Sequence, residues 1–460
     1  MDREIIHSRL MQLVDGNKKN ELRGALLMLN VVDIASFMES LESEKLLMVF
    51  RILPKDIAAE VFAYIDSEQQ QQLVTLIGDG EIHSLLDEMF LDDAVDFLEE
   101  LPASVVKRVL QNTDPTKRAL INQFLKYPEN SAGSIMTIEF AEFHNSMTVR
   151  QAMESLRKTG LDKETIYTCY IIDSERHLVG TLALRHLIMA DEDKPVSEIM
   201  ETNVISVKTL DDQEVVADTV RKYDLMSIPV VDNENRLVGI VTADDIMDVI
   251  EEENTEDIEM MGGLLPSDDQ YLKTPIITLF KNRIPWLLIL MISATFTGMI
   301  ITHFEDVLSD TGKLGVLLTA CLPMLMDTGG NCGSQSSTLV IRGLALGEVH
   351  FKDIFKVWWR EARVALLVGG VLMLVNIGRQ LLLYSFTAGV TADTVTVTMV
   401  VSVAMFLTVL IAKSIGCTLP LLASKLHLDP ALMASPLITT LVDACSLTIL
   451  FSIATAVMHV

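Results

Sequence analysis

Three kinds of hydrophobic pattern follow one another along the chain. From about residue 20 to 130, apolar residues recur at spacings of three and four, which is typical of amphipathic helices. From about 131 to 250, short β-branched runs lie between amphipathic helices, which predicts mixed α/β structure. From 284 onward, the apolar stretches are long enough to cross a bilayer, for which about 20 residues are needed. The pattern therefore predicts a multidomain membrane protein.

The helical segment contains an internal repeat. The LeuPro pair at 53–54 recurs at 101–102, 48 positions later. A repeat of that length with two helices per unit predicts a helical solenoid, so we expect an all-α superhelical domain over 1–130. The usual role of such a domain is that of a scaffold or docking surface.

A second repeat occupies the mixed segment. LeuValGly at 178–180 is repeated at 237–239, and each copy has the pattern helix, strand, turn, strand, helix. The copies cover 131–198 and 199–250. They resemble a tandem pair of CBS domains, regulatory modules that commonly bind adenosine ligands.

The second copy carries this resemblance in the stretch SIPVVDNENRLVGIVTADDIMDVI. Thr242 and Asp245 stand there at the positions where the CBS family contacts a ribose. The first copy has GTLALRHL at the corresponding place and lacks both the hydroxyl and the carboxylate. The resemblance therefore implies a nucleotide site that depends on the second copy, with ATP as a candidate ligand.

The charge is distributed unevenly along the chain, which has a formal net charge of −27. Residues 1–270 hold 24 basic and 53 acidic side chains (24 − 53 = −29), whereas residues 271–460 hold 12 and 10 (12 − 10 = +2). Such an acidic surface repels phosphate backbones, which argues against a nucleic acid partner and favours polyvalent cations. The five cysteines form no CxxC pair, so we expect neither a disulfide framework nor a thiolate metal site.

The densest acidic run follows the second CBS copy. Nine carboxylates and no basic side chain lie within 244–259. A solvated helix face is the usual meaning of such a run. Like charges four residues apart nevertheless destabilise a helix unless something neutralises them, so the alternative is a set of oxygen ligands for hard divalent cations. We expect a linking helix over 251–280, and the candidate ligands of the run are Asp245, Asp248, Glu253, Glu256 and Asp257.

The segment 281–460 reads as an all-α membrane domain. We count five spans, at approximately 284–303, 313–340, 362–386, 394–422 and 431–458. With the N-terminal part inside, ten of the 12 basic residues after residue 270 fall on the inner side, which supports an odd number of spans. We therefore expect a cytoplasmic N-terminus without a cleavable signal peptide and a C-terminus that faces out.

Polar residues interrupt the second and fifth spans. The second contains LPMLMDTGGNCGSQSSTLVIRGLALG, and the fifth contains ITTLVDACSLTIL. Lipid cannot satisfy such groups, so they must face protein or water. Close helix packing through small residues is one interpretation. An ion pathway is the other, because an ionisable residue at membrane depth is a functional candidate. Its candidate residues are Asp327, Gly329, Gly330, Asn331, Thr439 and Asp443.

The types of side chain within the spans narrow the choice of ion. The histidines of the membrane part fall at span edges or in loops, and its cysteines are scattered without a histidine partner. A transporter of zinc, copper or iron would be expected to offer imidazole or thiolate within the membrane. Oxygen ligands alone point to Mg²⁺, Ca²⁺ or a monovalent cation.

The whole order of segments, together with the motif PMLMDTGGNCGSQSS and the late Asp443, resembles the MgtE family of magnesium channels. The resemblance implies a homodimer in the inner membrane of a prokaryote, with a central pore lined by the second and fifth spans and Asp443 holding hydrated Mg²⁺. It also implies that cytoplasmic Mg²⁺ closes the pore, with the linking helix as a plug. The sensor positions would be Glu60, Asp92, Asp96 and the five carboxylates named above.

Two other functions remain open. One is a secondary transporter of another cation coupled to H⁺ or Na⁺, with Asp327 and Asp443 as the coupling carboxylates. The other is a membrane-anchored CBS nucleotide sensor. An enzyme is the least expected class, because the chain shows no nucleophile–base pair, phosphate loop or zinc helix motif.

Overall fold

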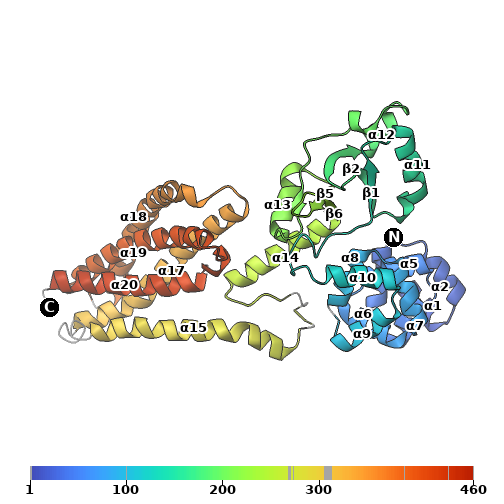
Figure 1. Ribbon diagram of the computed structural model, residues 1–460. Helices are drawn as coiled ribbons and strands as arrows, with labels where there is room; N and C mark the ends of the chain where they lie inside the picture. Colours follow the sequence, from blue (N-terminus) through green and yellow to red (C-terminus); the bar gives the residue numbers. More distant parts are fainter. Residues whose placement is uncertain are drawn as a thin grey trace. The chain divides into compact units, whose positions relative to one another are not determined.

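The computed structural model describes residues 3–99, 101–267, 271–272, 274–304, 313–387, 389–433 and 435–458. The chain forms two compact units, Met1–Glu251 and Glu252–Val460. Figure 1 gives the order of their elements along the chain. Each unit is described by itself.

The first unit begins with a stack of short helices. From α3 onward the helices start at regular intervals, and helices two places apart in the chain pack on each other, as α3 does on α5 and α5 on α7. The helices are α1 (Arg3–Asp15), α2 (Lys19–Leu26), α3 (Val31–Glu39), α4 (Ser43–Phe50), α5 (Lys55–Tyr64), α6 (Ser67–Leu76), α7 (Asp79–Glu88), α8 (Leu91–Glu99), α9 (Ala103–Asn112) and α10 (Pro115–Phe124).

This stack confirms the predicted all-α superhelical domain, but the predicted length of its repeat unit is wrong. Helices α5, α7 and α9 start at Lys55, Asp79 and Ala103, so the two starts that the LeuPro repeat relates lie two helix pairs apart instead of one. Proline precedes α5 and α9, whereas Gly78 precedes α7. The sequence therefore displayed twice the true period, because only alternate helix pairs share the LeuPro start.

The rest of the first unit holds two three-stranded sheets of the same topology. In each sheet the first two strands are parallel and the last two antiparallel. The first copy comprises β1 (Phe140–His144), α11 (Val149–Thr159), β2 (Thr165–Ile172), β3 (Leu178–Ala183) and α12 (Leu184–Met189). The second comprises β4 (Val207–Lys208), α13 (Gln213–Tyr223), β5 (Ser227–Val231), β6 (Leu237–Thr242) and the start of α14 (Ala243–Met261). The predicted repeat is confirmed, with an additional leading strand in each copy.

The two copies exchange their leading segments. Thr137 pairs with Ile240 of the second sheet, and Glu201 pairs with Thr181 of the first. A Cβ atom on Gly239 would lie 2.8 Å from Met136 Sδ, and one on Gly180 would lie 2.5 Å from Met200 Sδ. The glycine of each LeuValGly therefore gives room to the methionine that precedes the other copy. This interlocking makes the pair one structural body.

The predicted linking helix has different bounds. Helix α14 begins at Ala243, directly after β6, and ends at Met261, whereas the prediction was a helix over 251–280. Gly263 follows at φ +72, a left-handed conformation that glycine adopts readily, and the Leu264 amide donates to the Glu259 carbonyl. This turn ends the helix, and the next helix starts at Ile276.

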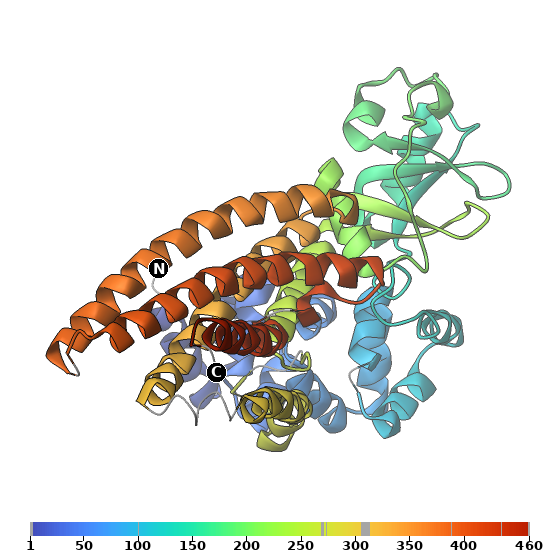
Figure 2. The same ribbon diagram turned by 90° about the vertical axis from the view of Figure 1, so that its left-hand side faces the viewer.

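The described residues of the second unit form five long helices: α15 (Ile276–His303), α17 (Lys313–Ala345), α18 (Ile354–Phe386), α19 (Ala392–Lys425) and α20 (Ser435–Met458). Helix α19 lies at the centre and contacts α17, α18 and α20, while α15 packs along α20. Figure 2 shows α18 and α19 side by side along much of their length. Among the described residues, four helical segments are long and apolar enough to cross a membrane, namely those of α15, α18, α19 and α20. Helix α17 carries the polar stretch.

Candidate functional site

The polar stretch of α17 has two faces. Asp327, Asn331, Gln335 and Thr338 follow at spacings of four, four and three, which places them on one side of the helix, and all four are exposed on the single chain. The other side is buried, with Ser336 fully covered. A polar face on a membrane helix needs water or another protein surface beside it, because lipid offers no hydrogen bonds.

Helix α20 places a carboxylate beside this stretch. Oδ1 of Asp443 is buried and has no hydrogen-bond partner within the described part of the chain. Asp327 of α17 is near enough to interact with it electrostatically. Thr439 stands one turn earlier on α20 and is half-buried. The structure thus brings together the two acidic residues that the sequence singled out in different spans.

The glycines of the polar stretch lie on its buried side. A Cβ atom on Gly329 would lie 2.7 Å from Thr408 of α19, and one on Gly330 would lie 2.9 Å from Thr439 of α20. Both glycines were predicted as pathway residues, and that role stays a prediction; the structure shows that both also lie in close helix packing. They let α19 and α20 approach α17 closely.

Among the described glycines of the bundle, Gly416 of α19 leaves the least room for a Cβ atom. A Cβ atom there would lie 2.2 Å from the carbonyl oxygen of Gly333 of α17, a backbone atom that cannot turn aside. We expect Gly416→Ala to destabilise the bundle by about 2–3 kcal/mol, because α19 must move away from α17. Thermal unfolding of the detergent-solubilised chain measures this effect. Gly370→Ala is the matched control, since its Cβ would meet nothing within 4 Å; equal stability of the two variants would contradict the prediction.

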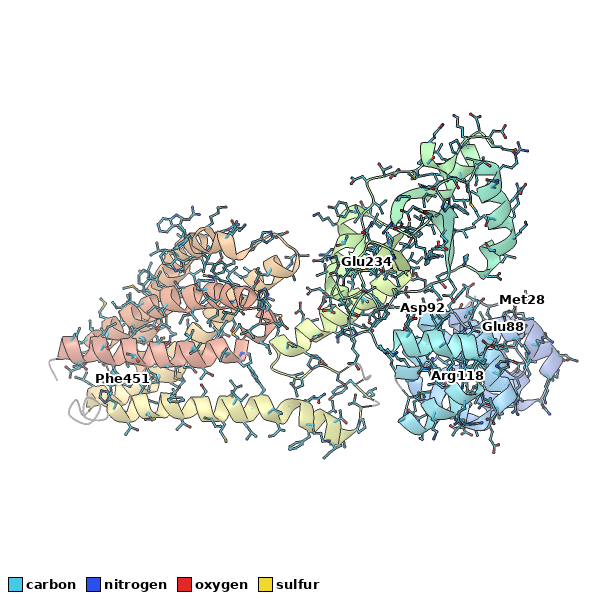
Figure 3. The ribbon with its side chains drawn as sticks, in the orientation of Figure 1. Met28, Glu88, Asp92, Arg118, Glu234 and Phe451 are labelled. Carbon is cyan, nitrogen blue, oxygen red and sulfur yellow. The ribbon has the colours of Figure 1, made fainter. Side chains whose placement is uncertain are left out.

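A second candidate site lies within the first unit, where the helical stack meets the CBS pair. Asp92 of α8 is 7% exposed and interacts electrostatically with Asp93, with Glu164 beside β2 and with Asp245 of α14. Figure 3 labels Asp92 on the side of the helical stack that faces the CBS pair. Oε2 of Glu164 is buried and lacks a hydrogen-bond partner among the described residues. Carboxylates from three distant segments therefore converge here.

Burial and mutual repulsion raise the pKa values of these groups. Burial raises the pKa of Asp92 well above its usual range, and it raises the pKa of Asp93 to about 6 with help from the charge of Asp245. The pKa of Glu164 rises to about 7 for the same reasons. Burial also raises the pKa of Asp245 to about 6, although the hydrogen bond from Thr242 opposes the shift. The cluster is thus strained when all its members are ionised.

One cation is built into the edge of this cluster. Lys117 of α10 donates to the carbonyl oxygens of Leu86 and Met89 at the end of α7. Burial lowers the pKa of Lys117, whereas Glu139 and the nearby aspartates favour its charged form. The ammonium group is engaged with the backbone, so it offsets the carboxylates only in part.

These pKa shifts predict how stability depends on pH. A carboxyl group whose pKa is higher in the folded than in the unfolded state favours folding while protonated, and this contribution is lost as pH rises through the folded pKa. Asp93, Glu164 and Asp245 set the window from about pH 4 to about pH 7. After screening at the partly exposed Glu164, we expect the free energy of unfolding to fall by about 2 kcal/mol between pH 5 and pH 8.

Thermal unfolding of a soluble segment that ends after α14, without divalent cations, measures this effect. Mg²⁺ at 10 mM should return most of the stability at pH 8 and little at pH 5, where protons already occupy the carboxylates. Stability that rises steadily from pH 5 to pH 8 would show that the cluster does not control it.

The other predicted metal residues are distributed over both units. Glu60, Asp96 and Asp248 are exposed on α5, α8 and α14. Glu253, Glu256 and Asp257 belong to the second unit, in which burial raises the pKa of Asp257 to about 6, with Asp429 and Glu253 nearby. Within the described ranges, no group of three or more His, Cys, Asp or Glu side chains is arranged to hold a metal ion.

The predicted nucleotide residues contact each other at the start of α14. The Thr242 hydroxyl donates to Asp245 Oδ2 at 2.5 Å, and the Thr242 amide donates to the same oxygen at 3.3 Å. Thr242 is 5% exposed. The pair holds Asp245 in a fixed position between the second CBS copy and the acidic cluster.

Comparison with known families matches three parts of the chain in order. A family described as the MgtE intracellular N domain matches residues 29–130, the CBS domain matches 196–252, and a divalent cation transporter family, MgtE, matches 322–453. The "Magnesium transporter MgtE" of Thermus thermophilus is 36% identical over 464 residues, which cover 99% of this chain and 98% of the relative. This chain belongs to the MgtE family. Another MgtE relative, the "Magnesium transporter MgtE" of Bacillus subtilis, is 32% identical over 93% of this chain and 94% of the relative.

Two solved structures of MgtE relatives resemble about half of this chain. "Crystal structure of the soluble part of a magnesium transporter" aligns with a TM-score of 0.52 at 35% identity and covers 55% of this chain and 99% of that chain. The cytosolic domain of the Mg²⁺ channel MgtE in complex with ATP aligns with a TM-score of 0.51 at 36% identity and covers 53% and 99%. These relatives are transporters, and the chain is a multi-pass membrane protein with an all-α N-terminal domain and a CBS pair.

Sequence reasoning missed several charged residues that the MgtE fold brings together. Asp93 could have been suspected because it follows Asp92 directly. Glu164 and Asp429 carry no sequence signal, since folding alone brings them to Asp92 and Asp257. The buried ion pair of Glu361 on α18 and Lys413 on α19, joined by Ser336 of α17, was missed as well.

Proposed function

We propose that this chain conducts Mg²⁺ across a membrane and that cytoplasmic Mg²⁺ closes it. The observation that carries the proposal is the exposed polar face of α17 beside Asp443, whose buried Oδ1 lacks a hydrogen-bond partner among the described residues. Membership of a family whose full-length relatives are named magnesium transporters supports the choice of ion.

In this proposal the pathway residues bind a hydrated ion. Mg²⁺ keeps several of its waters and binds few carboxylates, so two carboxylates and amide oxygens suit it better than a closed cage of ligands. Asp443 supplies the main attraction, Asp327 adds a second negative charge, and Asn331 accepts hydrogen bonds from the waters. Gly330 and Thr439 bring α20 close to α17.

The acidic cluster of the first unit is the proposed sensor. Asp92, Asp93, Glu164 and Asp245 repel one another when they lie close together, and a divalent cation between them removes that repulsion. The compact arrangement therefore binds Mg²⁺ more strongly than a loose one, which is the condition for a ligand to shift a conformational equilibrium. Helix α14 starts within the cluster at Asp244 and Asp245 and continues into the second unit, so it links the sensor to the pore.

The remaining carboxylates of α14 extend the proposed sensor. Burial raises the pKa of Asp257, and the nearby charge of Asp429 raises it further. These two carboxylates offer a second place for Mg²⁺ in the second unit. Asp248, Glu253 and Glu256 are further ligands of the acidic run, and Glu60 and Asp96 are further ligands of the helical stack. Each of these groups contributes weakly, and together they make closure steep.

ATP is a proposed second ligand of the CBS pair. Support comes from the cytosolic domain of the MgtE relative in complex with ATP, which is 36% identical. Thr242 and Asp245 are the residues proposed to bind the nucleotide. Since Asp245 also belongs to the acidic cluster, ATP binding would alter the sensitivity of closure to Mg²⁺.

We further propose a homodimer in the inner membrane of a prokaryote. The asymmetric distribution of basic residues around the spans supports a cytosolic N-terminus and an external C-terminus in this proposal. A second copy of the chain would supply the other wall of the pathway, since the polar face of α17 is exposed on the single chain. We keep the predicted domain limits 1–130, 131–198, 199–250 and 281–460, whereas the linking helix that was predicted over 251–280 is α14 (Ala243–Met261).

Mg²⁺ flux into proteoliposomes that hold the purified chain tests this function. Flux should fall as Mg²⁺ on the cytoplasmic face rises through the millimolar range, without any gradient of H⁺ or Na⁺. Flux that requires such a gradient would favour the secondary transporter. A folded chain without flux at any Mg²⁺ concentration would favour the anchored nucleotide sensor.

A further inference from the structure

An ion pair lies inside the apolar bundle of the second unit. Lys413 Nζ of α19 is 3.3 Å from Glu361 Oε2 of α18, and the side chains are 5% and 13% exposed. Ser336 of α17 joins them: its hydroxyl donates to Glu361 Oε2 at 2.7 Å, and Lys413 Nζ donates to Ser336 Oγ at 3.0 Å. Three charged or polar side chains from three helices therefore form a closed network.

The position of this network is costly for charged groups. Lys413 lies about three turns before the end of α19, roughly 18 Å along the helix axis, in the helix with the most apolar candidate span. An ionisable group in such surroundings is expensive unless it is paired, and removal of one partner leaves the other charge buried alone. Side chains that only needed to fill space at this point would be apolar.

We propose that the Ser336–Glu361–Lys413 network is a positioning clamp that fixes the rotation of α17 in the bundle. Ser336 is on the buried side of α17, opposite Asp327 and Asn331, and Gln335 of the exposed face is its neighbour in sequence. Successive residues of an α-helix are about 100° apart, so an anchor at Ser336 determines which residues the polar face presents. This inference rests on the proposed function, because that face is the proposed ion pathway.

A double-mutant cycle on the full chain tests the clamp independently of transport. We expect Glu361→Gln and Lys413→Met each to lower the thermal unfolding midpoint in detergent by about 5 °C or more, because each leaves an unpaired buried charge. The thermal unfolding midpoint of the double variant should be higher than that of the less stable single variant. The matched controls Glu348→Gln and Lys352→Met remove exposed charges of the same unit and should shift the midpoint by less than about 2 °C.

The orientation of α17 is measured by thiol labelling. Gln335→Cys should react with a water-soluble thiol reagent in the otherwise native chain, whereas Ser337→Cys on the buried side should not. Glu361→Gln or Lys413→Met should reduce this contrast at least about threefold, and Lys413→Arg should preserve it. Labelling is located by peptide mass spectrometry, so the five native cysteines stay in place.

Flux per folded molecule completes the test. Both single variants should conduct roughly tenfold less Mg²⁺ than the native chain, and the double variant should recover at least part of the loss. Strictly additive effects in the cycle, or a labelling contrast that stays native in both single variants, would overturn the clamp. If a single variant does not fold, the charge reversal Glu361→Lys/Lys413→Glu is used in its place. A reversal variant that folds but loses the labelling contrast between Gln335→Cys and Ser337→Cys would also overturn the clamp. Failure of the native chain to transport would count against the proposed function alone.

Discussion

Asp443→Asn is expected to reduce Mg²⁺ flux by roughly a hundredfold or more while the chain still folds. The substitution keeps the size of the side chain and removes its charge. A single carboxylate attracts a divalent cation strongly where little water screens it, and the buried Oδ1 of Asp443 has no competing hydrogen bond among the described residues. Flux into proteoliposomes, measured with low Mg²⁺ on the cytoplasmic face so that the sensor is open, gives the result.

The control for this variant is Asp393→Asn. Asp393 is an exposed carboxylate in the first turn of α19, so its loss should change flux by less than about twofold. Asp327→Asn should have an intermediate effect, because Asp327 is more exposed than Asp443. Native flux from a monodisperse Asp443→Asn variant would remove Asp443 from the pathway.

The features visible in the sequence were those that depend on contrast with their surroundings. Asp327 and Asp443 stood out because the neighbouring residues are largely apolar, and no knowledge of the fold was needed. The five long helices and both CBS copies were recognised for the same reason, since hydrophobic periodicity is a local property. The resemblance to the MgtE family was recognised from the order of these segments along the chain.

What the sequence did not reveal depends on contacts between distant segments. Glu164 is far from Asp92 in sequence, and only the docking of the CBS pair on α8 brings their charges together. Gly329 and Gly330 belong to the polar motif, and only the fold shows that they pack closely against α19 and α20. The ion pair of Lys413 and Glu361 is likewise invisible in the sequence, because only the packing of α19 on α18 brings the two side chains together.

Helix α14 joins the proposed sensor in the first unit to the second unit through the chain itself. Its first turn holds Asp245 of the acidic cluster, and its last turns belong to the second unit. A helix without interior proline or glycine is stiff, so a shift at its start is carried to its end. In the proposed mechanism, ion binding at the cluster therefore acts on the pathway through α14, without contact between the ion and the helices of the pathway.

The second large effect is expected from Asp92→Asn combined with Asp245→Asn. Flux at low cytoplasmic Mg²⁺ should stay within about twofold of the native value, while the Mg²⁺ concentration that halves it should rise about tenfold or more. Asp93, Glu164 and Asp244 remain and still repel one another, so the compact arrangement still needs a cation. That cation has lost two of the oxygens that favoured the compact state.

Two exposed carboxylates of the first unit, replaced together as Asp56→Asn/Asp224→Asn, give the matched control, and the Mg²⁺ response of this variant should be native. The direction of the change separates two mechanisms. Closure at lower Mg²⁺, or without any Mg²⁺, would mean that Asp92 and Asp245 act only by repelling their neighbours, since Asn removes that repulsion. A shift to higher Mg²⁺ requires that the carboxylates hold the ion, because only the loss of bound Mg²⁺ makes the compact state harder to reach.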